Sequence, residues 1–359
     1  MHMLITNWIK LIKLSTSILI TLIVLSFAFE VYSLTVDYKE RSAPLPDNYG
    51  NFDHVRALLN DDNKTEGFSF AVIGDIGSFG TFEKICAQLV NEQLSFVIIL
   101  GDFVNKGTLE DHQFYRCELG EPDYFSCPVF YGVGNHEIDK GFKFTVSDFE
   151  KIYGPSNYSF SYKGDLFIIL RTFPPHSTEE TLAFLERELS TKRNMHDKVF
   201  VFSHIPLYQS PDFPTRSLKD SELYVSLLEE YHVDYAISAD FHGYARVNVN
   251  KVNYVVTGGG GATLVNSNKY GNFHHALVVK VEENAVSERI LAVEKQRDIE
   301  DKIEHFAIAR VSPWVMQHKL ATLSLNILGF LLLVLATYLR LKKYPNESVH
   351  ELLRSGDLL

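Results

Sequence analysis

Cysteine and tryptophan are scarce in this chain, with three and two of them among 359 residues. No Cys-x-x-Cys pair and no Cys/His pattern with zinc-ligand spacing occurs, which argues against a zinc ribbon or finger. Cys117 and Cys127 bracket a short loop and can pair in an oxidising compartment. Alternatively, all three cysteines, Cys86 included, are buried free thiols, and the sequence leaves both states open.

Positive charge is also in short supply. Lysine and arginine number 34 against 45 acidic residues, which gives a net charge of −11. Nucleic-acid binding depends on Lys and Arg neutralising phosphates, so we expect no nucleic acid partner, and a nuclease is disfavoured. Hydrophobic residues make up 46% and charged residues 22% of the chain, a composition that can bury a full core.

The first apolar segment runs from Leu14 to Phe29, after Lys10 and Lys13. It is short for a membrane span, which needs about 17–25 residues, and its length suits the core of a signal peptide. Ser26-Phe27-Ala28 is an acceptable cleavage site, but an uncleaved anchor that extends a few residues further fits as well. We therefore assign residues 1–35 to a signal peptide or a signal anchor.

The second apolar segment is long enough to span a bilayer, and we expect a transmembrane helix over 320–339. Cations follow it at once, which predicts a short cytoplasmic tail over 340–359. The lysines near the N-terminus place that end in the cytoplasm too, so the body faces the periplasm, the cell exterior or an organelle lumen. The alternative is a buried hydrophobic helix. Residues 301–319 form a juxtamembrane segment.

A polar stretch over 36–66 predicts a linker and an early helix, and a domain over 67–300 follows. The domain first alternates short apolar runs with amphipathic stretches, the pattern of an α/β domain whose sheet is covered on both faces. The runs that predict strands are Phe68–Ile73, Phe96–Leu100, Val129–Val133, Leu166–Leu170, Val199–Phe202 and Tyr235–Ala239. Helices are predicted at about 82–94, 179–189 and 218–231. After residue 243, four further strands predict a second, β-rich layer.

Most of the strand ends carry a residue that can bind a metal ion: Asp75, Asp102, Asn135, His204 and the pair Asp240 and His242. Ligand sites of open α/β sheets lie outside the carboxyl ends of the strands. A single Asp there is usually a turn former or a helix cap, but a succession of polar strand ends is hard to attribute to capping. Oxygen and imidazole donors in this mixture suit Mn²⁺, Fe²⁺, Zn²⁺ or Mg²⁺, so the pattern predicts a metal centre.

The order of these motifs resembles the calcineurin-like metallophosphoesterase superfamily over roughly residues 68–294. The motifs are Gly74-Asp75-Ile76-Gly77, Gly101-Asp102, Gly134-Asn135-His136-Glu137, Ser203-His204 and Asp240-Phe241-His242. The resemblance implies a four-layer α/β/β/α sandwich with two divalent metal ions at the sheet ends. It leaves the identity of the ions open among Mn, Fe, Zn and Mg.

The resemblance also assigns roles by position. The first ion would be held by Asp75, Asp102 and His242, and Asp102 would bridge to a second ion held by Asn135, His204 and Asp240. His136 would lie unligated beside the phosphate, as general acid or as a donor to the developing phosphorane. The implied reaction is hydrolysis of a phosphate mono- or diester by a hydroxide that two ions about 3.5–4 Å apart activate.

Three positions depart from the family pattern. Residue 77 is Gly where most members have His, a form that resembles the purple acid phosphatase branch. That branch has a Tyr ligand three residues after the bridging Asp. This chain has Asn105 there, which offers at best a carbonyl oxygen, so a divalent first ion is favoured over Fe³⁺. Asp240 replaces the first His of the usual Gly-His-x-His motif, which favours Mn²⁺ or Mg²⁺ at the second site.

These departures leave two functions open. One is a membrane-tethered, metal-dependent phosphoesterase, and the other is a catalytically degenerate relative with a binding or scaffolding role at the membrane. Near the motifs, Arg246 either contacts the phosphate or forms a surface ion pair, and Gly258–Gly261 predicts a tight turn beside the site. His274 and His275 are expected to be packed or exposed. Three further histidines are expected on the surface: His112, His196 and His232.

Overall fold

The computed structural model describes residues 18–35, 44–50, 52–59, 67–77, 79–120, 124–138, 141, 144–172, 178–214, 216, 218–296 and 299–343. The lysines that precede the first apolar segment and the tail from residue 344 lie outside these residues. The chain divides into a larger unit, Ala43–Lys302, and a smaller unit made of Met1–Ser42 with Ile303–Leu359. Each unit is described by itself.

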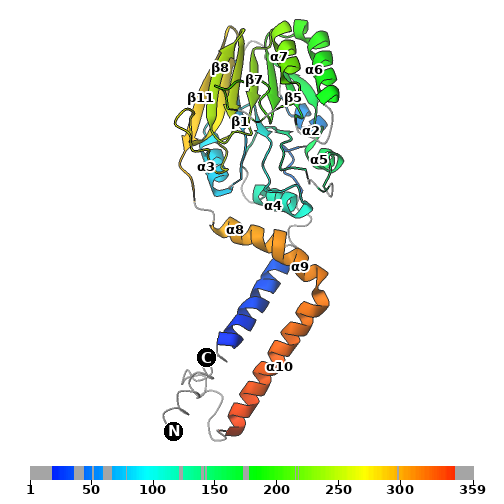
Figure 1. Cartoon of the computed structure of the whole chain (residues 1–359), viewed down its shortest axis with the longest axis vertical. Helices are drawn as coiled ribbons and strands as arrows, with labels where there is room; N and C mark the ends of the chain where they lie inside the picture. Colours follow the sequence, from blue (N-terminus) through cyan, green and yellow to red (C-terminus); the bar gives the residue numbers. More distant parts are fainter. Residues whose placement is uncertain are drawn as a thin grey trace. The chain divides into compact units, whose positions relative to one another are not determined.

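Two mixed β-sheets form the centre of the larger unit (Figure 1). The first sheet has the order β11-β10-β1-β2-β3. Its strands are β1 (Phe68–Ile73), β2 (Phe96–Leu100), β3 (Val129–Gly132), β10 (His274–Glu282) and β11 (Ala285–Val293). β1, β2 and β3 are parallel, so their carboxyl ends meet at one edge of the sheet.

The second sheet has the order β4-β5-β6-β7-β9-β8. Its strands are β4 (Tyr158–Tyr162), β5 (Asp165–Leu170), β6 (Val199–Ser203), β7 (Tyr235–Ser238), β8 (Tyr244–Val249) and β9 (Val252–Thr257). β5, β6, β7 and β9 are parallel, while β4 and β8 pair antiparallel at the two edges. The strands predicted from apolar runs are thus confirmed, and β4 is an addition.

The expectation of a separate β-rich layer after residue 243 is wrong. β9 pairs with β7 and carries β8 on its other side, so this hairpin extends the second sheet. β10 pairs with β1 and carries β11, so the last hairpin extends the first sheet. The physical reason is that β1 and β7 would otherwise leave backbone N–H and C=O groups unpaired at an edge, and each hairpin satisfies one edge.

Aromatic side chains fill the space between the two sheets. Phe70 stacks on Phe96 at 5.1 Å within the first sheet, and Phe167 stacks on Phe200 at 5.1 Å within the second. Phe70 meets Phe167 edge-on across the gap at 5.5 Å. Edge-on and stacked ring pairs add to the free energy of apolar burial, so this layer holds the sheets face to face.

Helices cover the outer faces of the sheets. α3 (Phe79–Leu89) lies on the first sheet, against β10 and β11. α6 (Thr178–Lys192) and α7 (Ser221–Glu230) lie on the second sheet (Figure 1). Their side chains Leu185, Leu189 and Leu228 are buried against it. The remaining helices of this unit are α2 (Phe52–Ala57), α4 (Leu109–Gly120), α5 (Val146–Tyr153) and a 3₁₀ turn, Arg193–Met195. The layer order is helices, sheet, sheet, helices.

All three cysteines lie in the larger unit as thiols, without a disulfide between them. Cys86 and Cys117 are buried and Cys127 is half-buried. The Cys117 thiol donates to the carbonyl of Gln113 at 2.9 Å, one turn earlier in α4. Of the two states left open by the sequence, the structure has the thiol state.

The described residues of the smaller unit are mainly helical. Its N-terminal helix is Ile18–Thr35, and its C-terminal part contains α9 (Ser312–Gln317) and α10 (Lys319–Lys343). A π-helical turn, Ala307–Val311, links α9 to α8 (Ile299–Phe306), which begins in the larger unit. Ile18–Thr35 is long and apolar enough to cross a membrane, with a mean hydropathy of 2.0. Lys319–Leu335 passes the same criterion only together with Ile299–Gln317, from which it is bent by 89°.

Candidate metal centre

Three aspartates that follow strands have a positive φ, a left-handed backbone conformation that residues other than glycine rarely adopt. Asp75 follows β1 with φ 58°, Asp102 follows β2 with φ 52°, and Asp240 follows β7 with φ 64°. The left-handed region costs a non-glycine residue about 1–2 kcal/mol. Strain of this kind concentrates at functional sites, where the surrounding structure enforces it. The three aspartates are therefore held in place at a cost in stability.

The ends of the two sheets bring the predicted ligands together. One ligand atom from each of Asp75, Asp102 and His204 lies within 4.8 Å of the others. His204 Nε2 lies 3.4 Å from Asp102 Oδ2 and 3.6 Å from Asp240 Oδ1. At the other end, His242 Nε2 lies 3.5 Å from Asp75 Oδ1. Side chains separated by up to 167 positions thus share one cleft, since the carboxyl ends of β1, β2, β6 and β7 meet there.

Backbone hydrogen bonds fix one oxygen of each of two carboxylates and leave the other for the cleft. Asp75 Oδ2 accepts the N–H of Asp240 at 3.0 Å. Asp102 Oδ1 accepts the N–H of His136 at 2.9 Å. The remaining oxygens, Asp75 Oδ1 and Asp102 Oδ2, are the ones that lie closest to the histidines.

The histidines are oriented in the same manner. His204 Nδ1 bonds the carbonyl of Leu100 at 3.0 Å, and His242 Nδ1 bonds the carbonyl of Thr263 at 2.7 Å. A carbonyl only accepts, so Nδ1 carries a proton and Nε2 is the ring atom that faces the carboxylates. This is the arrangement by which proteins prepare a histidine as a metal ligand.

Several buried polar atoms in the cleft have no hydrogen-bond partner among the described residues. They are Asp75 Oδ1, Asn135 Oδ1, His204 Nε2 and Asp240 Oδ1. Buried polar atoms are normally satisfied, and each unsatisfied one costs about 1–3 kcal/mol. Three oxygens and an imidazole nitrogen are all groups that can bind a metal ion, and Asp240 Oδ1 has an ion pair with Arg216 but no hydrogen bond within the described part of the chain. A bound divalent cation would satisfy all of them, so the residues present fit a metal centre.

Charge and burial shift the protonation of these groups. Burial raises the pKa of Asp75. Although burial alone acts in the same direction on Asp102, the neighbouring His204 and His136 lower its pKa to about 2. The surrounding carboxylates raise the pKa of His204 despite its burial, and the hydrogen bond to Asp75 raises that of His242 to about 9. Without a metal ion, the carboxylates thus favour protons on the histidines.

His136 lies at the open side of the cleft. Its side chain is half-exposed, and Nε2 lies 3.8 Å from Asp102 Oδ2. Nδ1 donates to the carbonyl of Asn105 at 2.6 Å, while the side chain of Asn105 is exposed. Asn105 therefore orients His136 through its backbone. Arg246 pairs with Glu288 at 2.9 Å, which is the surface ion pair of the two alternatives.

The structure explains why residue 77 is glycine. Gly77 has φ +53°, and a Cβ atom there would lie 2.8 Å from the Cα of Ala262. The segment that occupies the space follows the glycine run, and Ala262 donates its N–H to the carbonyl of Asp75 at 2.9 Å. A Cβ on Gly258 would lie 2.5 Å from Asp75 Oδ2. The glycine run thus lies directly beside the site, but the prediction of a tight turn is wrong: the run begins the connection from β9 to β10, and Gly258 and Gly260 donate their N–H groups to the carbonyls of Gly243 and Gly74.

Glu137 is a functional residue to which the sequence reasoning gave no role. Its buried carboxylate accepts the N–H groups of Asp102 and Phe103 at 2.9 Å each and of Gly134 at 2.6 Å. Burial, with Asp102 nearby, raises its pKa to about 8. Glu137 thus ties the ends of β2 and β3 together. The available signal was its place directly after His136.

The expectation that His112 lies on the surface is wrong, because its ring is fully buried. It stacks on Phe144 with ring centroids 3.9 Å apart. Its Nε2 bonds the carbonyl of Glu137 at 2.8 Å and its Nδ1 bonds the hydroxyl of Tyr153 at 2.9 Å. His112 therefore supports the metal-site loop from behind. His274 and His275 are buried, His196 is half-buried and His232 is exposed.

A second unassigned residue, Arg216, reaches the site from the connection after β6. Its guanidinium Nη2 lies 2.7 Å from Asp240 Oδ1. Nothing in the sequence pointed to Arg216, which lies in no motif and belongs to a segment without regular structure.

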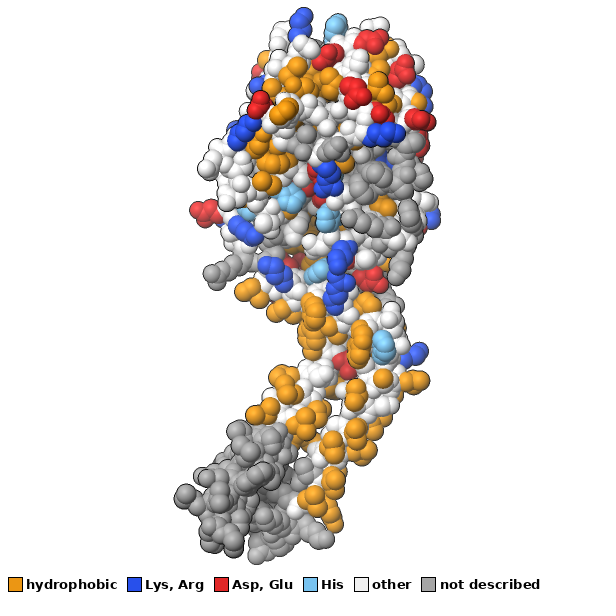
Figure 2. Space-filling model, in the orientation of Figure 1, with side chains coloured by type: hydrophobic (Ala, Val, Ile, Leu, Met, Phe, Trp, Pro, Cys, Tyr) orange, Lys and Arg blue, Asp and Glu red, His pale blue; other side chains and the backbone are white. Residues whose placement is uncertain are grey.

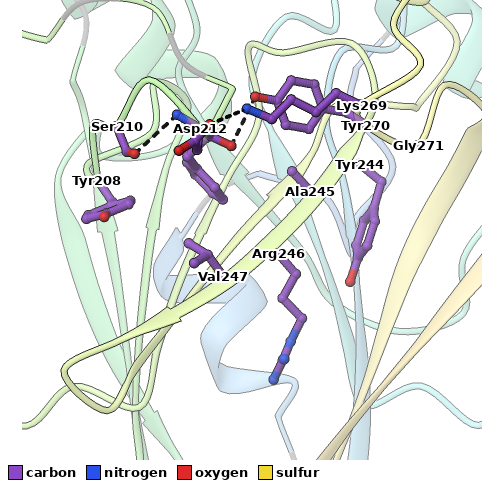
Figure 3. Close-up of a pocket in the computed structure, with 11 residues that line it drawn as sticks. Tyr208, Ser210, Asp212, Tyr244, Ala245, Arg246, Val247, Lys269, Tyr270 and Gly271 are labelled. Carbon is purple, nitrogen blue, oxygen red and sulfur yellow. Dashed lines mark hydrogen bonds and ion pairs between the residues drawn. The ribbon is translucent and has the colours of Figure 1, made fainter.

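A cavity of about 460 Å³ lies over β8 (Figure 3). Its lining includes Tyr208, Val247 and Tyr270, and the ring of Tyr270 packs edge-on against Phe241 at 5.2 Å. Asp212 and Lys269 pair at 2.7 Å across its rim (Figure 3). One residue of the cavity lining thus packs against Phe241, which lies between Asp240 and His242 in the chain.

Comparisons with known proteins agree with this geometry. Residues 68–244 match the family model of the calcineurin-like phosphoesterases. A probable cyclic nucleotide phosphodiesterase of Xenorhabdus bovienii is 22% identical over 177 residues, which cover 47% of this chain and 70% of that protein.

One solved structure extends the comparison to the fold. A dimetal phosphatase from Danio rerio has 16% identity and a TM-score of 0.51, covering 64% of this chain and 97% of that one. At such an identity the likeness concerns the fold alone. GAP50, the anchor in the inner membrane complex of Plasmodium, has 18% identity and a TM-score of 0.49, covering 68% and 96%. Residues 68–244 of this chain therefore form a calcineurin-like phosphoesterase domain, the domain of a family of phosphoester hydrolases.

Proposed function

We propose that this chain is a membrane-tethered, metal-dependent phosphoesterase that hydrolyses a phosphate mono- or diester. The observation that carries the proposal is the set of buried, unpartnered donor atoms on Asp75, Asn135 and His204. Carboxylates cluster around them, and such a cluster without a cation is electrostatically unfavourable. The family match over residues 68–244 supports the reaction class.

Two divalent ions fit the donor set. Asp75, Asp102 and His242 would hold the first, and Asp102, Asn135, His204 and Asp240 the second. When bound, such ions supply Lewis acidity toward the phosphoryl oxygens and make a water molecule nucleophilic near neutral pH. The protein's contribution is to hold the ligand atoms in place by the hydrogen bonds from backbone N–H groups to Asp75 and Asp102.

His136 is the residue that we assign to proton transfer. The carbonyl of Asn105 holds the proton on Nδ1, so Nε2 is the ring atom that faces the cleft. A proton held at Nε2 can pass to the leaving oxygen, or it can donate a hydrogen bond to the charge that develops on the phosphoryl group. The half-exposed position of the ring leaves room for a substrate beside it.

The smaller unit supports tethering to a membrane. Apolar side chains are exposed along Ile18–Thr35 and along α10 (Figure 2). The two helices pack on each other: Asn326 donates to the carboxylate of Glu30 at 2.6 Å, and Ile23 lies against Gly329. We propose that both helices remain in the mature protein and cross the bilayer together, with both chain ends in the cytoplasm and the enzyme domain on the other side.

Substitution of Asp102 tests the proposed chemistry. Asp102→Asn keeps the size of the side chain and removes the charge that both ions would share. We expect the rate of metal-dependent turnover to fall by a factor of about 10³ or more. A charged carboxylate ligand contributes several kcal/mol to the stabilisation of the transition state by the metal ions. The melting temperature of the variant should stay close to that of the metal-free wild type.

The substrates for this assay are aryl phosphomonoesters and phosphodiesters, with cyclic nucleotides included because of the relative's name. Each is offered with Mn²⁺, Mg²⁺, Zn²⁺ or Fe²⁺ to the full-length protein in detergent. Full activity of Asp102→Asn would overturn the site assignment. Wild-type protein that binds metal but hydrolyses none of the esters would instead favour the non-catalytic binding or scaffolding role.

A further inference from the structure

The ion pair between Arg216 and Asp240 places a protein cation on an oxygen of the candidate second metal site. The guanidinium lies 2.7 Å from Asp240 Oδ1, and this same oxygen lies 3.6 Å from His204 Nε2. The Asp240 side chain is 4% exposed, whereas Arg216 is 49% exposed. Arg216 therefore reaches from the surface to a buried carboxylate, and about half of its side chain stays in contact with solvent.

The segment that carries Arg216 is anchored at this side of the cleft. Gln209 donates through Nε2 to the carbonyl of Arg216 at 2.8 Å. Ser210 and Phe213 form an isolated bridge that folds the same segment back on itself. Arg216 is thus held on this side of the site by a hydrogen bond to its own backbone carbonyl.

The two proposed ion sites differ in the side chains that form ion pairs with their carboxylates. Among the described residues, the ion pairs of Asp75 and Asp102 are with histidines, and the guanidinium is directed at Asp240. Asp240 adds a negative charge where the resembling family has a neutral histidine, and Arg216 compensates that charge. A guanidinium and a divalent ion at the same carboxylate oxygen repel each other and compete for its lone pairs, so each weakens the binding of the other.

We propose that Arg216 is a displaceable cation that occupies the second metal site and sets its affinity. An ion at the first site, between Asp75, Asp102 and His242, binds without disturbing Arg216. An ion at the second site binds only when the guanidinium leaves Asp240, so the two sites fill in order. The inference rests on the metal centre of the proposed function, and it concerns metal affinity, which is measurable without turnover.

The test is a titration of full-length, metal-depleted protein in detergent with Mn²⁺, followed by calorimetry and by counting bound ions after dialysis. For the wild type we expect one tight and one weak site. Arg216→Gln should tighten the weak site about tenfold, because it removes the one guanidinium charge that competes with the ion for this carboxylate, and should leave the tight site unchanged. Asp240→Asn, which removes the charge of the proposed ligand and the ion pair together, should not show the tightening.

Lys219→Gln is the matched control. It removes one positive charge from the same connection, but Lys219 is 81% exposed and faces Asp220 at 3.7 Å. We expect no change at either site. A melting curve in chelator checks that the variants fold.

Two results would overturn the proposal: an unchanged or weaker second site in Arg216→Gln, and an equal effect of Lys219→Gln, which would reduce the finding to general electrostatics. The outcome is separable from the proposed function. Tightening in Arg216→Gln without turnover on any ester supports the proposal while the enzymatic function fails. Turnover with unchanged metal constants in Arg216→Gln retains the function and rejects the proposal.

Discussion

Single residues around the cleft act mainly through the backbone. Asn105 contributes a carbonyl to His136, Glu137 gathers backbone N–H groups, and Gly77 makes room for Ala262. A list of the side chains that can bind a metal ion does not reveal these roles, because the contacts are made by the backbone. Many polar residues at the site therefore orient the proposed ligands and are not ligands themselves.

Gly77 gives the prediction at the residue scale. Introducing the usual family residue by Gly77→His should not create an additional metal ligand. It should lower the free energy of unfolding by about 3 kcal/mol or more, because it adds left-handed strain to a collision with the backbone of Ala262.

Chemical unfolding and Mn²⁺ titration of the variant measure both effects. Gly164→His is the matched control, since Gly164 also has a positive φ, +90°, but a Cβ there would meet only the side chain of Asp197, at 3.1 Å. The control should lose about 1–2 kcal/mol from strain alone and bind Mn²⁺ as the wild type does. Tighter metal binding by Gly77→His would show that the segment at Ala262 yields easily, and it would contradict the steric explanation.

Among the elements, the pair formed by Ile18–Thr35 and α10 bears on whether the N-terminal segment is cleaved. Ile23 contacts Gly329 and Glu30 contacts Asn326. Residue numbers thus rise along the first helix while those of the contacted residues in α10 fall, so the two helices are antiparallel. A small residue and a polar hydrogen bond are the usual means of helix association in a bilayer. Cleavage near Ser26-Phe27-Ala28 would cut inside this helix.

We therefore predict that the N-terminal helix is retained and stays bound to α10. The experiment places a protease site within residues 36–43, cleaves the purified protein in detergent and asks whether the released helix co-purifies with the rest. Glu30→Leu should lower the co-purifying fraction several-fold, since an interhelical hydrogen bond contributes about 0.6–2 kcal/mol.

Glu30→Gln, which keeps an acceptor for Asn326, should behave as the wild type. Intact mass measurement of the protein from membranes gives an independent check, and a mature chain that begins after residue 28 would refute the retained helix.

For the whole molecule, buried histidines predict a dependence of stability on acidity. Burial lowers the pKa of His275 to about 4, while its Nε2 bonds Thr257 and its Nδ1 bonds the carbonyl of Phe273. The unfolded chain takes up this proton near pH 6.5 and the folded chain only near pH 4. The contribution of His275 to the free energy of unfolding is therefore fully present above pH 6.5 and is lost as the pH falls toward 4.

Between pH 7 and pH 5, the loss from His275 should amount to about 2 kcal/mol. Asp165, whose pKa burial raises to about 6, titrates in the opposite sense, so the measurement must compare variants. His275→Gln should lose less stability than the wild type over this range in chemical unfolding with chelator present. His232→Gln, at an exposed position, should lose as much as the wild type. Equal losses in all three proteins would contradict the prediction.

The sequence by itself determined the strands and the class of chemistry, because apolar runs and the residues that end them are local features. Phe68–Ile73 and Phe96–Leu100 are too apolar to be exposed on either face, and Asp75 and Asp102 follow them wherever the strands lie. Parallel pairing then brings such strand ends to a common edge. The family resemblance followed from the same motifs, and the match over residues 68–244 confirms it.

Only the tertiary structure decided how distant segments share space. The two C-terminal hairpins join different sheets because each satisfies a different open edge, a choice that their own sequences do not encode. His112 is buried because Phe144 and the loop of Glu137 close over it. Arg216 became part of the site because a connection after β6 folds back to Asp240. Long-range packing and charge pairing set all three, and no window of sequence contains both partners.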